Sequence, residues 1–195
     1  HTIGGLSRLL LNTLKNRLGS SGEMLHHLAN GIDDSKVLPP SEAKSISRET
    51  TFSEDTRDRS FLEATLWAQS EKVGADLRKK GKQAKCVTLK LRYADFTTIT
   101  RSHTLRESVD TDRTIFEAGI ELLEKALAVE KQAVRLIGIG ISNLVEANQQ
   151  TTLFAPSDEK QEDLNKVIDR IRDRYGFGAI KTGRAMRLKD VSTQS

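Results

Sequence analysis

The stretch 85–105 constrains the fold most, because it has the pattern of two strands joined by a short turn. In its first half, apolar side chains recur at every second position: Val87, Leu89, Leu91 and Tyr93. Polar side chains occupy the positions between them: Thr88, Lys90 and Arg92. Ala94 and Asp95 interrupt the alternation and a β-branched run resumes at Thr97, which predicts a β-hairpin.

The two faces of this hairpin differ in chemistry. One is apolar enough to pack on helices. The other supplies cations and hydroxyl groups without a cluster of carboxylates, which favours a platform for phosphates. An ordinary antiparallel sheet with one face in water would show the same pattern.

Composition narrows the functional class only slightly. Only 5% of the 195 residues are aromatic and 30% are charged, so the core must be mostly aliphatic. The net charge of +4 permits nucleic acid as a partner without requiring it, since what matters is where the charge lies. Seven Lys or Arg and no Asp or Glu fall within residues 78–92.

The single cysteine, Cys86, excludes an intrachain disulfide and a cysteine-based zinc cluster, and it fits a reducing, cytoplasmic compartment. No metal spacing is found among the four histidines, which are His1, His26, His27 and His103. No apolar run is long enough to span a bilayer. We therefore expect a monomer with no membrane segment, no catalytic residue and no cofactor or metal of its own. Because the chain begins at His1, we also expect it to be a piece of a longer protein.

Residues 1–32 are typical of a small helical domain. A helical apolar stripe (Leu6, Leu9, Leu10, Leu14, Leu18) stops at Gly19, a tight turn runs from Gly19 to Gly22, and a second helix ends near Gly31. In such a helix-hairpin-helix, backbone N–H groups around Gly19 and Gly22 could hold a phosphate without reading sequence. A plain helical corner is the alternative. Residues 33–43, with Pro39-Pro40, read as a linker.

The central part, 44–145, predicts a strand at 44–52, a helix at 60–80, the hairpin, a helix at 113–128 capped by Asp112, and a strand at 134–143. This β-α-β-β-α-β order is that of a ferredoxin-like split βαβ. The expected fold class is α+β, with a four-stranded antiparallel sheet and both helices on one face. A connector at 146–157 leads to a C-terminal helix and a short strand at 158–182, followed by a tail at 183–195. The C-terminal helix should direct Leu164, Val167, Ile168 and Ile171 inward.

Several motifs resemble Y-family DNA polymerases of the DinB (DNA polymerase IV) type. Lys44–Phe52 (KSISRETTF) resembles the strand that opens the little-finger domain, Lys90–Phe96 (KLRYADF) with Thr100-Arg101-Ser102 resembles its central hairpin, and Arg135–Gly138 (RLIG) with Ser142-Asn143-Leu144 resembles its last strand. Thr2-Ile3-Gly4 and Ala29–Asp33 (ANGID) are similar to the thumb domain, and Asp169–Arg172, Arg174–Gly176 and Ala179-Ile180 to the terminal helix of bacterial members.

This resemblance implies a template-dependent polymerase that copies past damaged bases, built from palm, fingers, thumb and little finger. Its chemistry lies in the palm, where carboxylates hold two Mg²⁺ ions. No matching carboxylate motif occurs in this sequence, so we expect the chain to bind template-primer duplex and not to synthesise DNA.

The resemblance also implies which residues bind DNA. The candidates are Lys44, Ser45, Ser47, Arg48, Lys90, Arg92, Thr98, Thr100, Arg101, Ser102, Thr104 and Arg135. Strand alternation places Arg101 and His103 opposite the face of Thr98 and Thr100, so a bulge would be needed to bring Arg101 round. We expect His103 to be a sheet residue and Glu49 to pair with Arg48.

Residues 150–154 (QTTLF) resemble the peptide by which bacterial polymerases dock on the sliding clamp. Leu153 and Phe154 could fill an apolar pocket while Gln150 forms a hydrogen bond at its rim. Alternatively, Leu153 and Phe154 pin the C-terminal helix onto the preceding domain.

A different functional class stays open: a stand-alone protein-interaction module that docks through its sheet face or through Gln150–Phe154. Phosphate binding predicts an affinity that falls steeply with salt, whereas protein docking does not. An RNA-binding domain of the same element order is disfavoured, because the aromatic pair that stacks bases on such sheets is missing.

Overall fold

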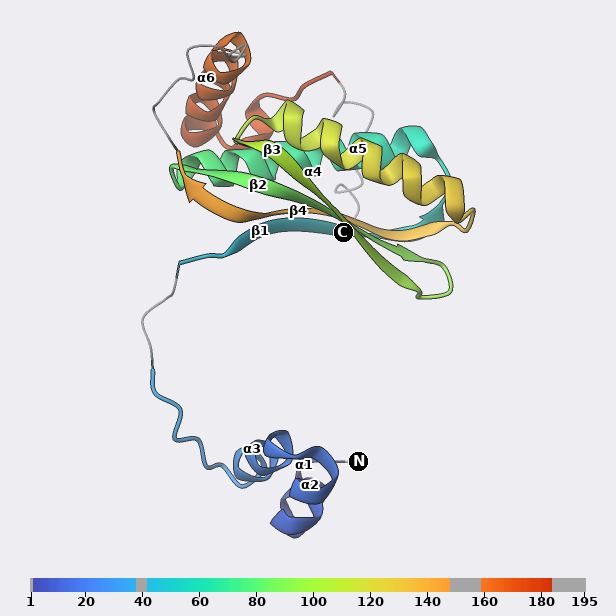
Figure 1. Cartoon of the computed structure of the whole chain (residues 1–195), viewed down its shortest axis with the longest axis vertical. Helices are drawn as coiled ribbons and strands as arrows, with labels where there is room; N and C mark the ends of the chain where they lie inside the picture. The colour runs from blue at the N-terminus through green and yellow to red at the C-terminus, as the bar shows by residue number, and fades with distance from the viewer. Residues whose placement is uncertain (1, 38–41, 148–158, 184–195) are drawn as a thin grey trace. The chain divides into compact units, whose positions relative to one another are not determined.

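The computed structural model describes residues 2–37, 42–147 and 159–183 (Figure 1). The chain divides into two compact units, residues 1–42 and 43–195, and each is considered by itself. No helix in the described ranges is long and apolar enough to cross a membrane.

The first unit contains three helices, α1 (Ile3–Ser7), α2 (Leu11–Leu18) and α3 (Ser20–Ala29). The prediction of one continuous first helix is wrong, because the backbone is extended at Leu10, where α2 begins. The prediction of a tight turn from Gly19 to Gly22 is also wrong, because α3 already begins at Ser20. Gly19 alone joins α2 to α3, with φ at 61°, in the left-handed region that glycine adopts without a steric penalty.

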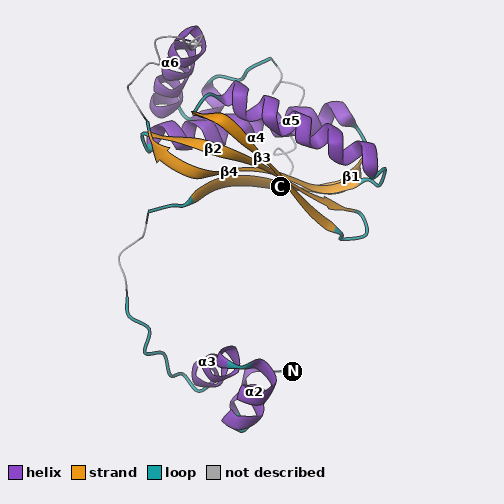
Figure 2. Ribbon diagram, viewed as in Figure 1, coloured by secondary structure: helices purple, strands orange, loops and turns teal. Residues whose placement is uncertain are grey.

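The second unit has the predicted β-α-β-β-α-β order and α+β class. Its elements are β1 (Ser45–Thr56), α4 (Arg59–Lys79), β2 (Lys82–Tyr93), β3 (Thr98–Val109), α5 (Asp112–Val129) and β4 (Val134–Glu146). Figures 1 and 2 show α4 and α5 together on one side of the sheet. The other side, which we call the open face, carries no helix of this unit within the described residues.

All neighbouring strands are antiparallel, in the order β1-β4-β2-β3. The ferredoxin-like arrangement is therefore wrong in detail, since that fold places the first strand inside the sheet and here β4 is inside. The side chains explain the exchange. Ile137, Ile139 and Ile141 of β4 are buried against the helices, as suits an interior strand, whereas most residues of β1 are exposed, as suits an edge.

Aliphatic side chains fill the space between the sheet and the helices. The strands contribute Val87, Leu89, Leu91, Ile137, Ile139 and Ile141, and the helices contribute Leu62, Leu66, Val73, Leu77, Ile115 and Leu123. The Asp58 carboxylate caps α4 by accepting hydrogen bonds from the N–H groups of Ser60 and Phe61. The predicted cap of α5 is wrong by one residue: Thr111 is the cap.

The C-terminal helix α6 (Glu159–Tyr175) is held largely by polar contacts. Arg78 of α4 donates hydrogen bonds to Asp169 and Asp112, and Arg172 donates to the buried Glu71 at 3.0 Å. The predicted inward positions hold only in part, since Ile168 is buried but Leu164 and Val167 are half exposed. A 3₁₀ helix, η1 (Phe177–Ala179), replaces the predicted short strand.

Candidate nucleic-acid interface

Strand register decides which side chains reach the open face, because residues directly opposite each other on adjacent strands share a face. On β2 and β3, Thr88 lies opposite Ser102, Lys90 opposite Thr100, and Arg92 opposite Thr98. On β1 and β4, the corresponding pairs are Ser45 with Ser142, Ser47 with Gly140, Glu49 with Gly138 and Thr51 with Leu136. Apart from the buried Leu136, these rows of the open face consist of hydroxyls, glycines and a few charges.

Two glycines form the middle of this face. Gly138 and Gly140 of β4 lie between β1 and β2, so the interior strand presents backbone there instead of side chains. A Cβ on Gly138 would lie 2.8 Å from Cβ of Glu49. Glu49 reaches across this gap, and its Oε2 accepts a hydrogen bond from Lys90 Nζ at 2.7 Å. The predicted pairing of Glu49 with Arg48 is wrong, since adjacent strand residues point to opposite faces.

Hydrogen bonds order the side chains along the hairpin. Arg92 Nε donates to Thr98 Oγ1 at 2.9 Å, and the hydroxyls of Thr88 and Ser102 are 2.9 Å apart. The terminal nitrogens of Arg92 have no protein partner in the described part of the chain, so they remain available to an external acceptor. This is the donor set that binds phosphate oxygens.

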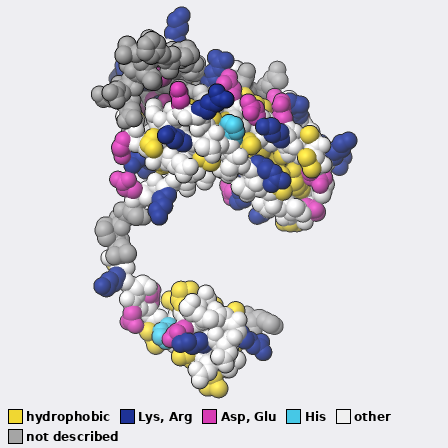
Figure 3. All heavy atoms as spheres, in the orientation of Figure 1, with side chains coloured by type: hydrophobic (Ala, Val, Ile, Leu, Met, Phe, Trp, Pro, Cys, Tyr) yellow, Lys and Arg dark blue, Asp and Glu magenta, His cyan; other side chains and the backbone are white. Residues whose placement is uncertain are grey.

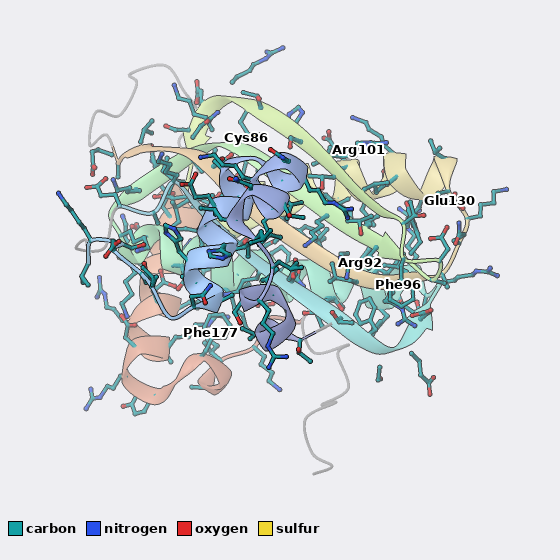
Figure 4. The ribbon with its side chains drawn as sticks, turned by 90° about the horizontal axis from the view of Figure 1, so that it is seen from below. Cys86, Arg92, Phe96, Arg101, Glu130 and Phe177 are labelled. Atoms are coloured by element: carbon teal, nitrogen blue, oxygen red, sulfur yellow. The ribbon has the colours of Figure 1, made fainter. Side chains whose placement is uncertain are left out.

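The hairpin turn adds an aromatic ring. Phe96 lies 63% exposed with φ at 66°, a backbone region that bulky residues rarely adopt. The guanidinium of Arg135 lies over this ring, 4.5 Å from its centroid, and also pairs with Asp55 at 3.0 Å. The backbone N–H of Thr97 and then the amide of Gln132 lower the pKa of the Asp95 carboxyl, which keeps the turn anionic. Figure 4 shows Arg92 and Phe96 at this end of the sheet.

Two predicted candidates lie on the opposite side of the sheet. Arg48 points toward α4 and pairs with Asp76. Arg101 lies opposite Leu89, on the helix side, and its Nη1 donates to the carbonyl of Thr100 at 3.1 Å. The pairing is regular from Cys86/Thr104 to Arg92/Thr98, so no bulge turns Arg101 toward the open face. His103 shares the helix side, opposite Val87, as expected of a sheet residue.

The remaining candidates fall at the rim or in the first unit. Lys44 is exposed just before β1, and Thr104 of β3 lies opposite Cys86 of β2. In the first unit, the N–H of Gly19 donates to Lys15 and that of Gly22 donates to Gly19, so neither N–H is free for a phosphate. A Cβ on Gly22 would lie 2.2 Å from the Leu14 carbonyl oxygen, so this glycine allows α2 and α3 to touch.

The charges of the second unit are mixed. Figure 3 shows Lys and Arg side chains interspersed with Asp and Glu over the visible surface. The strands of the open face contain no exposed large apolar side chain among the described residues, since Phe96 lies in the turn. The surface therefore suits polar contacts better than apolar docking.

The resemblance places Mg²⁺ in the palm, and the described residues contain no group of three or more His, Cys, Asp or Glu that could hold a metal ion. The predicted clamp peptide, with Gln150, Leu153 and Phe154, lies outside the described residues.

Sequence reasoning missed three contributors to this site. The first is Ser142, which lies opposite Ser45. The second is the pair Gly138 and Gly140, which keep the centre of the face flat. The third is Phe96, which extends the hairpin end. The alternation of Ile137, Ile139 and Ile141 with the two glycines was the available signal, because it assigns the glycines to the face opposite the core.

Comparisons with known proteins give consistent matches. Residues 43–176 match the model of the impB/mucB/samB family C-terminal domain. Curated relatives named DNA polymerase IV include one from Dehalococcoides mccartyi strain CBDB1, 46% identical over 190 residues, which are 97% of this chain and 48% of the relative. One from Caulobacter vibrioides is 39% identical over 95% of this chain and 46% of the relative, and one from Clostridium kluyveri is 36% identical over 93% of this chain and 48% of the relative. The chain spans about half the length of the curated relatives it matches.

Proposed function

Because this chain belongs to the impB/mucB/samB family, and so to the Y-family polymerases of the DinB type, we propose that it is the DNA-gripping portion of a translesion polymerase. Its open face binds template-primer duplex through phosphates and does not read sequence. The parent protein is a DNA-directed DNA polymerase, and this portion has no catalytic role of its own.

The observation that carries the proposal is the chemistry of the open face. Lys90, Arg92 and the hydroxyls of Thr98, Thr100 and Ser102 lie on one side of a continuous hairpin. These groups donate hydrogen bonds to phosphate oxygens, which are the same at every base pair. Gly138 and Gly140 keep the centre of the face low, so a DNA backbone could approach the sheet closely.

Fluorescence anisotropy of the chain on a labelled primer-template duplex, across a salt series, tests this proposal. Arg92→Ala should weaken binding and reduce the slope of log affinity against log salt by about 0.9, the value for one phosphate contact. Arg101→Ala is the matched control, because it removes the same charge from the same hairpin on the opposite side of the sheet. The two variants should differ clearly at equal salt.

Binding that is indifferent to salt, or equal losses in Arg92→Ala and Arg101→Ala, would refute the open face as the DNA site. Scrambling the duplex sequence should leave the affinity unchanged, because phosphate contacts carry no sequence information.

A sliding clamp is a second proposed partner, through Gln150, Leu153 and Phe154. Holding DNA and clamp together would raise residence on the template through effective concentration. Replacing Leu153 and Phe154 by Ala should abolish clamp binding while leaving the anisotropy titration on DNA unchanged.

A further inference from the structure

A basic cavity of about 660 Å³ lies on the helix side of the second unit, between α4 and α6. Seven Lys or Arg and three Asp line it, a surplus of four positive charges. Its position separates it from the open face, and none of the roles proposed above uses it.

Some of these cations hold the fold together. Arg78 pairs with Asp112 and Asp169, and Arg172 pairs with Glu71. Three others, Lys72, Lys79 and Arg170, are exposed at the rim and have no carboxylate partner among the described residues. No described carboxylate holds these three cations in an ion pair, although Asp173 also lines the cavity.

Arg172 also has unused hydrogen-bonding capacity. Its side chain is buried, and Nη2 is used, but Nε and Nη1 donate to no acceptor in the described chain. Buried donors without a partner are unusual in folded proteins. The guanidinium lies 4.0 Å from the ring centroid of Phe177, which is 36% exposed and also lines the cavity. Cations beside an exposed aromatic ring are typical of sites for single-stranded nucleic acid.

The edge strand connects this cavity to the open face. Ser45 and Ser47 of β1 belong to the open face, whereas Arg48 points to the other side and lines the cavity. Among the described residues no further strand pairs with the outer edge of β1, and a nucleic-acid strand passing around this edge would join the two surfaces. The volume lies within the range of about 300–1,000 Å³ of small-ligand sites, which suits one or two nucleotides and not a duplex.

We propose that this groove between α4 and α6 binds the phosphates of a single strand that extends from the duplex held on the open face. The proposal rests on the proposed function for the duplex part, but the groove has its own cations and can be tested separately.

The test compares three labelled ligands by fluorescence anisotropy: a blunt duplex, the same duplex with a single-stranded overhang of about eight nucleotides, and the overhang alone. The double variant K79Q/R170Q removes two unpaired cations from the groove. The matched control K125Q/K131Q removes two exposed cations from α5 and the turn that follows it.

The overhang should raise the affinity of the unmodified chain roughly 25-fold at about 0.1 M salt, from two phosphate contacts of about 0.7 log unit each. K79Q/R170Q should abolish this gain and leave blunt-duplex affinity unchanged, whereas K125Q/K131Q should keep the gain. No gain from the overhang, or a gain that survives in K79Q/R170Q, overturns the proposal.

Failure of the proposed function would give a different result. The blunt duplex would not bind, whereas the overhang alone would still bind to the unmodified chain and would lose this binding in K79Q/R170Q. Adenosine triphosphate is added as a competitor. Displacement of the overhang at equal phosphate concentration would show that the groove binds free nucleotides, which overturns the assignment to a strand.

Discussion

The ion pair between Glu49 and Lys90 predicts that removing a carboxylate will strengthen DNA binding. Lys90 Nζ lies 2.7 Å from Glu49 Oε2 on the open face, so the carboxylate offsets the positive charge that Lys90 presents to a phosphate. Glu49→Gln keeps the shape of the side chain and frees this charge. The variant should fold normally, because ion pairs between exposed side chains contribute only about 0–1 kcal/mol.

The magnitude follows from counterion release. One additional phosphate contact adds about 0.9 to the slope of log affinity against log salt, which at about 0.1 M salt corresponds to roughly eightfold tighter binding. Lys90→Gln should weaken binding by a similar factor, because it leaves Glu49 uncompensated on the face. The double variant should return close to the original slope.

Anisotropy titrations on the primer-template duplex at several salt concentrations measure these changes. Glu117→Gln is the control, since Glu117 is an exposed carboxylate that pairs with Arg113 at 2.8 Å on α5, on the other side of the sheet. If Glu49→Gln and Glu117→Gln raise affinity equally, the effect comes from net charge alone and the reasoning about the open face is refuted. An unchanged affinity in Glu49→Gln would refute it as well.

Three further predictions concern the scaffold and are measured by urea unfolding. Gly74→Ala should lower the free energy of unfolding by about 2–4 kcal/mol, because the new Cβ would lie 2.1 Å from Asp112 Oδ1 and would separate Asp112 from Arg78. This loss is expected although replacing glycine by alanine usually stabilises a helix by about 1 kcal/mol. In an Asp112→Ala background the same change should be stabilising, and a loss in both backgrounds would contradict this explanation. Burial raises the pKa of Asp112 from 3.8 to about 6, despite the nearby Arg78. Between about pH 4 and 6 the folded state therefore binds more protons than the unfolded state, so the contribution of this carboxyl to stability should fall as pH rises through that window. Asp112→Asn should flatten this dependence, and an unchanged pH profile would count against it. Gly22→Ala should destabilise the first unit, because its Cβ would meet the Leu14 carbonyl oxygen, and a gain in stability would exclude that contact.

The order of elements could be predicted because each has its own periodic signal. Strand alternation in Val87–Tyr93 and the helical apolar positions of α4 and α5 do not depend on partners. Strand order was not predictable in the same way, since it depends on which apolar strand the helices cover. The isoleucines of β4, with glycines between them, are the feature of the sequence that indicates an interior strand.

The candidate site was predictable at the level of faces and not of pairs. Alternation correctly separated Thr98 and Thr100 from Arg101. It could not show that Glu49 meets Lys90, because these residues lie on different strands with β4 between them. The buried pairs of Arg78 and Arg172 with acidic partners were likewise invisible, since charged residues are expected at the surface and their partners are distant in sequence.

The strand order also determines when the sheet can be completed during synthesis. β2 and β3 are joined by a short turn and can pair as soon as both have left the ribosome. β1 is made first, but in the described part of the chain it pairs only with β4, so Ser45 cannot pair until Ser142 has been made. Closing so long a loop is slow compared with forming a hairpin. The strand that begins the domain is therefore expected to be the last to join the sheet, with its backbone unpaired until nearly the whole domain has emerged.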